Sequence, residues 1–224
     1  MTIIDLTHTI REDMPVYPGT QPPRLETANT YEKDLFKETL ITMFSHTGTH
    51  MDPPAHIFPE GKTLDRFPAD QFMGQALAID CRDLKEGEAI TMAHIRKYGE
   101  KAKQADFLLF NMGWDRFWGE PAYFGNFPCI DDEVLDYILA RHYKGIGVDT
   151  ISIDPMNSLV RHRKLFREKE MVVIENLKDL HRCGHDLFHF SCFPLKIHDC
   201  DGSPVRAVAW LEQLDSLHKI KAHL

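Results

Sequence analysis

Short apolar runs recur along the chain and predict a fold built largely from strands. Runs of this length suit buried strands better than buried helices, and they lie at residues 76–80, 106–110, 145–148, 171–174 and 206–211. β-prone residues predict two further strands, at residues 2–10 and 38–45.

Helical patterns lie between several of these runs. Thr91 is a suitable N-cap for a helix over residues 92–98. The acidic residues 131–133 suit the start of a second helix, which continues with apolar residues at helical spacing. Residues 159–169 predict a third short helix. The whole pattern predicts a mixed α/β fold with more strand than helix.

The size and composition of the chain favour a single domain. Its 224 residues are 43% hydrophobic, which is enough to bury a continuous core. No repeat, low-complexity tract or Gly/Ser linker marks a boundary between two folding units. We therefore predict one domain over residues 1–224.

Charge and cysteine content exclude several classes of protein. The formal charge is −8, and the 26 basic and 34 acidic residues are interleaved, so no basic stripe is present for nucleic acid. No apolar stretch approaches the roughly 18 residues of a membrane span, and the first residues do not resemble a signal peptide. The five cysteines form no Cys-x-x-Cys pair, which is typical of reduced thiols. We expect a cytoplasmic protein that binds neither nucleic acid nor membrane.

The chemical signal is concentrated between residues 46 and 56. His46, His50, Asp52 and His56 supply imidazole and carboxylate donors of the kind that hold Zn²⁺ or Mn²⁺, and no cysteine lies among them. Two histidines and one carboxylate leave coordination positions open for water and substrate. The donor set therefore favours a catalytic metal site over a structural one.

The spacing of these donors requires a turn. In a straight strand His46 and His50 would lie about 13 Å apart, at roughly 3.3 Å per residue, which is too far for two ligands of one ion. Gly48 can adopt the backbone conformation of a turn, and Pro53 and Pro54 prevent a long helix from continuing beyond the motif. A tight loop or a single helical turn would bring the donors to one point.

The segment 46–56 resembles the signature of the cyclase family of metal-dependent hydrolases, which includes bacterial kynurenine formamidases and isatin hydrolases. That signature, His-x-Gly-Thr-His-x-Asp-x-Pro-x-His, is matched at every fixed position. The resemblance extends over nearly the whole chain, through residues 4–10, 14–19, 148–154, 174–177, 194–197 and 201–207. It implies a swivelling β/β/α fold with a mixed sheet and flanking helices, and a homodimer or homotetramer.

The resemblance also implies the roles of individual residues. One metal would be bound by the first two motif histidines and the aspartate, which would bridge to a second metal held by a later histidine and the glutamate of a Glu-Asn-Leu segment. The implied metal ligands are His46, His50, Asp52, His162 and Glu175. His56 would be the catalytic acid/base. The expected cofactor is Zn²⁺, one or two per subunit, with Mn²⁺ as an alternative.

Two of these ligands also have an ordinary structural interpretation. His162 lies in a very polar segment that is typical of a solvated helix face. Glu175 ends the buried run 171–174, where a carboxylate needs a partner such as a cation. Asp149 and Asp154 are expected to hold the loop after a strand through backbone hydrogen bonds.

Three other histidines recur at every fourth residue without matching ligands nearby. We interpret His181, His185 and His189 as loop or surface residues near the rim of the pocket, and not as a second zinc site.

Aromatic residues are available for a substrate pocket. In the family, an aromatic residue of the N-terminal loop stacks on the substrate in its own or a neighbouring subunit, and Tyr17 stands at that position. Kynurenine formamidases usually have Trp there and Asp at the place of Thr20. Phe58 adjoins the motif and is the second predicted substrate contact. Other candidates are Phe44, Trp114, Trp118, Tyr123 and Phe124.

The predicted function is metal-dependent hydrolysis of an amide bond in a small molecule. The first candidate substrate is N-formyl-L-kynurenine, which would give kynurenine and formate. Two alternatives stay open: hydrolysis of an isatin-like lactam or a lactone, or a cyclisation or dehydration, on the same site; and a non-catalytic metal-binding homologue.

Overall fold

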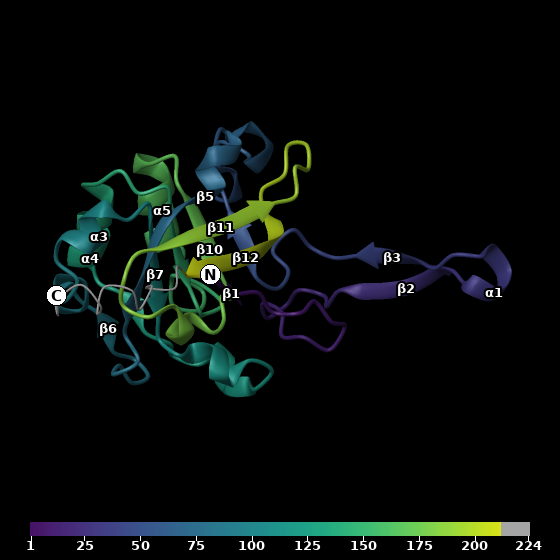
Figure 1. Cartoon of the computed structure of the whole chain (residues 1–224), viewed down its shortest axis with the longest axis horizontal. Helices are drawn as coiled ribbons and strands as arrows, with labels where there is room; N and C mark the ends of the chain where they lie inside the picture. Colours follow the sequence, from purple (N-terminus) through teal and green to yellow (C-terminus); the bar gives the residue numbers. More distant parts are fainter. Residues whose placement is uncertain (212–224) are drawn as a thin grey trace, which may run out of the picture.

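One mixed eight-stranded sheet organises the chain, of which a computed structural model describes residues 1–211 (Figure 1). The strand order is β1-β12-β11-β5-β7-β9-β10-β4, and β4 also pairs with β12, so the sheet closes on itself like a barrel. The strands are β1 (Thr2–Asp5), β4 (His50–Asp52), β5 (Met73–Asp80), β7 (Phe107–Asn111), β9 (Gly145–Val148), β10 (Val172–Glu175), β11 (Phe188–Pro194) and β12 (Ser203–Leu211).

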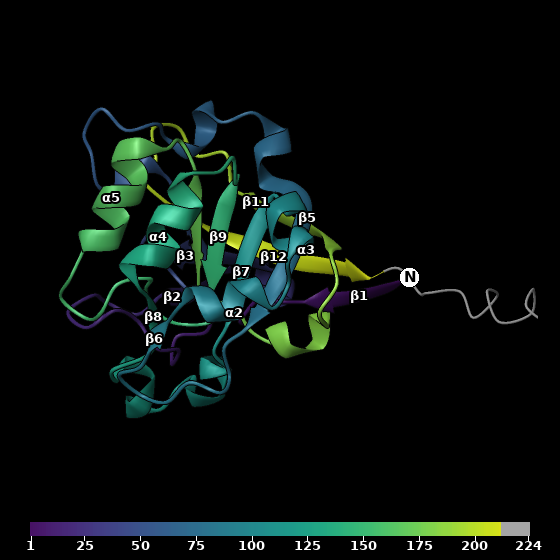
Figure 2. The same cartoon turned by 90° about the vertical axis from the view of Figure 1, so that its left-hand side faces the viewer.

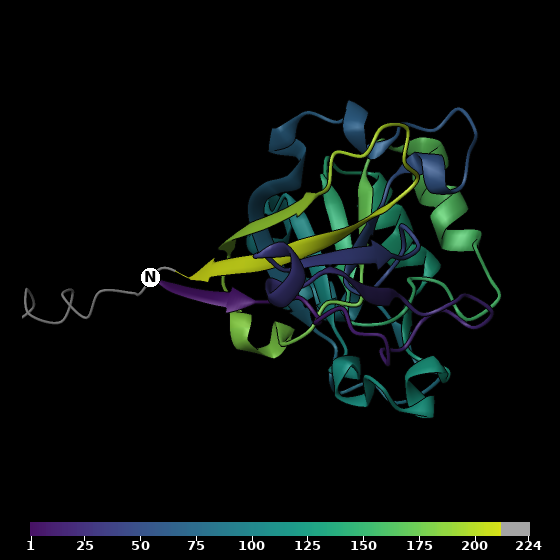
Figure 3. The same cartoon turned by 90° about the vertical axis from the view of Figure 1, so that its right-hand side faces the viewer.

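Helices cover one side of the sheet, as Figure 2 shows. The longer ones are α2 (Met92–Arg96), α3 (Glu100–Gln104), α4 (Asp132–Leu139) and α5 (Val160–Glu168). Short 3-10 helices lie at Pro54–His56, Leu64–Arg66, Ala69–Phe72, Trp114–Phe117, Pro121–Phe124 and Leu180–Cys183. β12 and β1 cross the opposite side, which faces the viewer in Figure 3.

A two-stranded arm projects from this body (Figure 1). It consists of β2 (Arg24–Asn29) and β3 (Glu38–Thr42), with the single turn of α1 (Tyr31–Asp34) at its tip. Every residue of β3 is exposed, as are nearly all of β2. β6 (Ala89–Ile90) and β8 (Cys129–Ile130) form a smaller parallel pair.

The central parallel strands are buried on both faces, which explains their continuous apolar runs. Successive residues of β7 point to opposite sides, so Leu108 and Phe110 join a core under the helices, while Phe107 and Leu109 join a second core on the other face. All four are 0% exposed. The sheet therefore separates two hydrophobic cores.

The structure confirms the predicted mixed α/β class and the five strands predicted from apolar runs, with shifted ends. Residues 145–148 are a strand as predicted. The strand predicted over residues 2–10 ends at Asp5. Beyond it Leu6 and Thr7 still hydrogen-bond to Ala207 of β12, and Thr7 forms an isolated bridge with Leu177. The strand predicted over residues 38–45 ends at Thr42.

The three predicted helices are present but shorter, over Met92–Arg96, Asp132–Leu139 and Val160–Glu168. Thr91 caps the first of them in a capping box with His94. The sequence analysis missed β2, β4, β6, β8, β11, α1 and α3.

None of the helices within residues 1–211 combines the length and apolar character needed to cross a membrane. The prediction of one domain over residues 1–224 stays a prediction, since residues 212–224 lie outside the described part of the chain.

Candidate metal centre

The histidine motif folds as a turn followed by a short strand. Gly48 has φ of +67°, in the left-handed region that glycine adopts without strain, and the chain reverses there as predicted. His50 and Asp52 then lie two residues apart on β4, so they share one face of the sheet. Antiparallel pairing with β10 places Glu175 directly opposite His50.

The structure brings the five predicted metal ligands together. Asp52 lies at the centre: its Oδ1 is 2.7 Å from Nδ1 of His46 and 3.3 Å from Nε2 of His50. On the other side, Nε2 of His162 is 3.5 Å from Oδ2 of Asp52 and 3.3 Å from Oε1 of Glu175. His50 and Glu175 are 3.5 Å apart. Residues from β4, β10 and α5 thus converge on one point.

Two overlapping groups of donors share the Asp52 carboxylate. In each group the ligand atoms lie within 4.8 Å of one another: His46, Asp52 and His56 form one, and His50, Asp52 and Glu175 form the other. The grouping differs from the expected one, in which His46 and His50 hold the same ion. His50 stands between the two positions because β4 pairs with β10.

The position of one buried nitrogen between two carboxylates supports the fit of the donor set to a divalent cation. His162 is only 2% exposed, and its Nε2 has no hydrogen-bond partner although it points between two carboxylates. A buried polar atom without a partner is costly. A metal ion between Asp52, Glu175 and this nitrogen would satisfy all three groups. His162 is therefore not the solvated helix residue that its polar neighbours suggest.

Asp154 orients the ring of His162. Its Oδ2 lies 2.8 Å from Nδ1 of His162 and accepts the His162 backbone N–H at 3.1 Å, while its Oδ1 accepts that of Arg161 at 2.9 Å. A carboxylate that fixes the second ring nitrogen of a histidine ligand sets both its tautomer and its direction. The predicted backbone bonds are present, but they start α5, and the contact with the His162 ring was not predicted.

Asp149 has a different role. It accepts the backbone N–H groups of Met112 and Trp114, at 3.1 and 3.0 Å. These belong to the loop after β7, so Asp149 holds the loop after a strand through backbone hydrogen bonds, as predicted, and that loop follows the neighbouring strand.

The charges of the site are strongly coupled. Burial opposes the protonation of His46, but the attraction of Asp52 and Asp201 outweighs it and raises the pKa of His46 to about 10. In turn, His46, His50 and His162 hold the pKa of the Asp52 carboxyl well below its usual range despite burial. The centre is therefore built to hold positive charge next to Asp52.

His56 lies beside the ligands with a different environment. Its ring is 4.0 Å from that of His46, and its side chain is 29% exposed. Burial lowers the pKa of His56, which leaves the imidazole neutral at neutral pH. A neutral imidazole next to the cavity can accept a proton.

Asp201 is a site residue that the sequence analysis missed. Its Oδ2 lies 3.1 Å from Nε2 of His46 and 3.7 Å from Nδ1 of His56, and Ser45 donates to its Oδ1 at 2.9 Å. The residue belongs to a segment, 201–207, that carried the family resemblance, and this was the only available signal. Its distance from the motif in sequence hides the contact.

The donors line a cavity of about 530 Å³ whose other wall is largely apolar. Tyr17 and Phe44 contribute aromatic surface, and Ile151 and Leu159 aliphatic surface. The Tyr17 hydroxyl accepts the backbone N–H of Asn157 at 3.4 Å. The N-terminal loop therefore reaches the cavity of its own chain.

Phe58 does not line this cavity. It packs against the core beneath the helices, with the guanidinium of Arg167 5.7 Å from its ring centre. Trp114, Trp118, Tyr123 and Phe124 are also absent from the lining. Phe58 was predicted to contact the substrate because it adjoins the motif in sequence. This prediction was wrong, because beyond the 3-10 turn that follows Pro53 the side chain packs away from the cavity.

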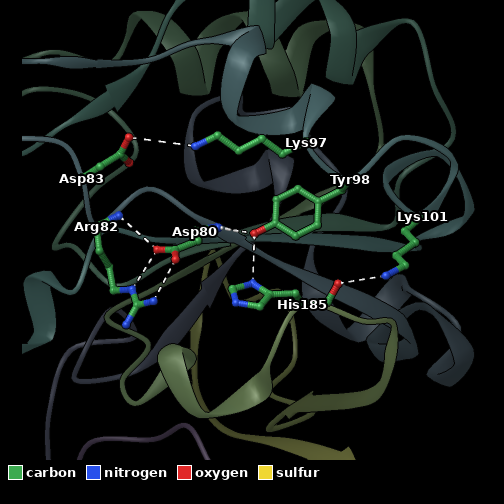
Figure 4. A pocket seen from close by; sticks show the side chains of 7 residues that line it. All are labelled: Asp80, Arg82, Asp83, Lys97, Tyr98, Lys101 and His185. Atoms are coloured by element: carbon green, nitrogen blue, oxygen red, sulfur yellow. Dashed lines mark hydrogen bonds and ion pairs between the residues drawn. The ribbon is translucent and has the colours of Figure 1, made fainter.

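A second cavity, of about 670 Å³, lies at the end of β5 (Figure 4). Its cations are neutralised: Arg82 contacts Asp80 at 2.7 Å, Lys97 contacts Asp83 at 3.9 Å, and Lys101 pairs with Asp186. The balanced charges give no reason to expect a charged ligand.

The three regularly spaced histidines are exposed, as predicted for surface residues. His185 lines the cavity of Figure 4, and none of the three lines the cavity at the histidine motif. His189 is on β11 and not in a loop.

Comparisons with known proteins agree with the motif. Residues 4–155 match the family model described as putative cyclase. A kynurenine formamidase from Geobacillus thermodenitrificans is 30% identical, over 91% of this chain and 95% of that protein. One from Bacillus thuringiensis is 28% identical, over 92% and 95%. An uncharacterised protein from Methanocaldococcus jannaschii is 31% identical, over 94% and 100%.

Solved structures share the fold. Isatin hydrolase A from Labrenzia aggregata has a TM-score of 0.83 at 24% identity and covers 95% of this chain and 94% of that one. A predicted metal-dependent hydrolase from Bacillus stearothermophilus has a TM-score of 0.75 at 25% identity, over 93% and 97%. These likenesses confirm the α/β cyclase-type fold expected from the sequence.

Proposed function

The chain belongs to the putative cyclase family, and from that premise we propose that it is a metal-dependent hydrolase of a carbon–nitrogen bond in a small amide. The observation that carries this proposal is the unpartnered, buried Nε2 of His162, held between the carboxylates of Asp52 and Glu175 next to an open cavity. The name of the Bacillus stearothermophilus structure, a metal-dependent hydrolase, supports it.

The ligands proposed for one or two Zn²⁺ ions, with Mn²⁺ as the alternative, are His46, His50, Asp52 and Glu175, which belong to the two donor groups, and His162, which lies 3.5 Å from Asp52 and 3.3 Å from Glu175. When bound there, a divalent ion would supply Lewis acidity, which polarises a carbonyl group and makes a water molecule more acidic. Imidazole and carboxylate donors suit both metals.

His56 is the proposed catalytic acid/base. Its lowered pKa keeps the ring neutral, so it can take a proton from the attacking water. The same ring then returns the proton to the leaving nitrogen, because an unprotonated amine leaves poorly. Asp201 faces Nδ1 of His56 at 3.7 Å and would favour the charged form between these two steps.

N-formyl-L-kynurenine is the first candidate substrate, and the two relatives named kynurenine formamidase support it. The aryl ring would lie against the apolar wall of the cavity, next to Tyr17 and Phe44. An isatin-like lactam would use the same wall and the same proton transfers, and a fold shared with isatin hydrolase A makes it the second substrate to test.

Product analysis tests the proposal. Protein stripped of metal and reloaded separately with Zn²⁺ and Mn²⁺ is given N-formyl-L-kynurenine and, in parallel, isatin. Metal-restored release of formate is the expected result. Turnover of isatin alone would keep the hydrolase and replace the substrate, and metal binding without any turnover would support a non-catalytic homologue.

We also propose a cytoplasmic homodimer or homotetramer. The cysteines of the described residues are unpaired, as expected of a reducing compartment. The projecting arm exposes apolar side chains that a second copy of the chain would cover.

A further inference from the structure

A buried amide side chain next to the metal centre takes no part in the proposed chemistry, yet it contacts the histidine turn. Asn176 follows Glu175 at the end of β10, is 1% exposed and has φ of +58°. Its Nδ2 donates to the carbonyl oxygen of Gly48 at 2.7 Å and lies 3.3 Å from Nδ1 of His50. Asparagine is one of the few residues that tolerate this backbone conformation. The site therefore includes an amide held behind one of its ligands.

The hydrogen-bond partners fix the orientation of this amide. A carbonyl oxygen only accepts, so the NH₂ group of Asn176 must face Gly48, and its Oδ1 must face Tyr123. The Tyr123 hydroxyl lies 2.7 Å from that Oδ1 and therefore donates to it. Tyr123 is 0% exposed, and burial raises its pKa well above the usual value, so the donor keeps its proton.

The same carbonyl fixes the tautomer of His50. Nδ1 of His50 lies 2.8 Å from the Gly48 oxygen, which cannot donate, so Nδ1 carries the proton. The lone pair then belongs to Nε2, the atom that lies 3.3 Å from Asp52 and 3.5 Å from Glu175. The bond that Nδ1 makes thus decides which nitrogen can bind a metal.

We propose that Asn176 and Tyr123 are positioning residues for the metal ligand His50. The Tyr123 hydroxyl holds the Asn176 amide, and the amide holds the Gly48 carbonyl where it accepts from Nδ1 of His50. A second hydrogen bond runs from the Thr49 hydroxyl to the backbone carbonyl oxygen of Asn176, at 2.6 Å, and links the same turn to the end of β10. This inference rests on the proposed metal site but not on the proposed substrate.

Two variants test the chain of bonds. Asn176→Gly removes the amide and still adopts a positive φ without strain, and Tyr123→Phe removes only the hydroxyl that orients it. Tyr143→Phe is the matched control, because Tyr143 is also buried and donates to the Ala102 carbonyl at 2.6 Å, among the helices. The measurement is the Zn²⁺ dissociation constant of the stripped protein, from competition with a chelator, with thermal unfolding of the metal-free form.

Asn176→Gly should weaken Zn²⁺ binding by about 10-fold or more, a typical effect of losing a group that orients a ligand. Tyr123→Phe should weaken it by a smaller factor. Tyr143→Phe should lower the unfolding temperature as Tyr123→Phe does, yet leave the dissociation constant unchanged. NMR of the imidazole nitrogens should show a protonated Nδ1 in His50 of the wild type and a mixture of tautomers in Asn176→Gly.

The outcomes separate this inference from the proposed function. If the wild type binds Zn²⁺ and both variants bind it equally well, the positioning role is wrong and the metal site stands. If Tyr143→Phe weakens binding as much as Tyr123→Phe, the effect is one of general stability and the inference is also overturned. A wild type that binds no metal would overturn the site and the inference together.

Discussion

At the residue scale, the histidines of the site divide by what surrounds each ring. His46, His50 and His162 lie close to the buried carboxylates of Asp52 and Glu175, whereas His56 lies beside the His46 ring, the exposed carboxylate of Asp201 and the open cavity. Gly48 and the prolines limit how residues 46–56 can fold, so the motif predicted that their donors meet, whereas His162 was predicted only from the family resemblance. The contacts of Asp154 and Asp201 with histidine rings were not predicted, since no local pattern distinguishes a carboxylate that orients a histidine from one on the surface.

Replacement of His56 by Ala separates catalysis from metal binding. His56→Ala should lower kcat by about 10² to 10⁴, the usual contribution of a general acid/base, with the metal content unchanged. Formate release and metal analysis of the same preparation provide the measurement. An unchanged rate would remove His56 from the mechanism.

Asp154 should matter for metal affinity because it fixes Nδ1 of His162 at 2.8 Å. Asp154→Ala should weaken Zn²⁺ binding by roughly 10- to 100-fold. Asp131→Ala is the matched control: Asp131 accepts the Val134 backbone N–H at 2.8 Å at the start of α4, so its loss costs about 1 kcal/mol of folding stability. Equal affinities in the two variants would contradict the orienting role.

At the scale of elements, apolar runs predicted the central strands but not the one that carries the site. β4 has only three residues, two of them the polar ligands His50 and Asp52. β11 was missed although Phe188, Phe190 and Cys192 alternate inward as strand residues do, because the nearby histidines suggested a loop. Pairing with distant segments decides β4 and leaves no local signal there, whereas β11 carried a local signal in its alternating residues.

The loop before β12 packs closely against the histidine turn, and Gly202 lies next to the ring of His46. A Cβ atom at Gly202 would lie 2.5 Å from Cε1 and 2.6 Å from Nε2 of His46. Gly202→Ala should therefore displace this ring, lower the Zn²⁺ affinity and leave the fold intact, since a side chain can move where backbone cannot. Metal titration measures the affinity, and circular dichroism checks the fold. If the variant binds Zn²⁺ with wild-type affinity, the His46 ring can accommodate the added methyl group without losing its position.

At the scale of the whole molecule, closure of the sheet by β4 brings distant parts of the chain together at the site. The loop that contains Asp201 leads into β12, and the start of β12 pairs with β4. The arm of β2 and β3 stands outside this closed body (Figure 1). A two-stranded ribbon alone is marginally stable in water. We therefore expect another protein surface to cover the exposed apolar residues of the arm.

The arm predicts how copies of the chain associate. Leu25 and Ile41 are directly paired across it and are 36% and 53% exposed. The wild type should elute with the mass of a dimer or larger assembly in light-scattering chromatography. The double variant Leu25→Ser, Ile41→Ser should shift towards the monomer. An unchanged mass would place the interface elsewhere on the molecule.

The central claim is that Asp52 lies at the centre of a metal site, and equilibrium dialysis against Zn²⁺ or Mn²⁺ tests it most directly. Because the Asp52 carboxylate belongs to both donor groups, the account predicts one or two ions per chain for the wild type and none retained by Asp52→Ala, with both proteins folded. A wild type without stoichiometric metal, or an Asp52→Ala variant that binds as much, would contradict the account.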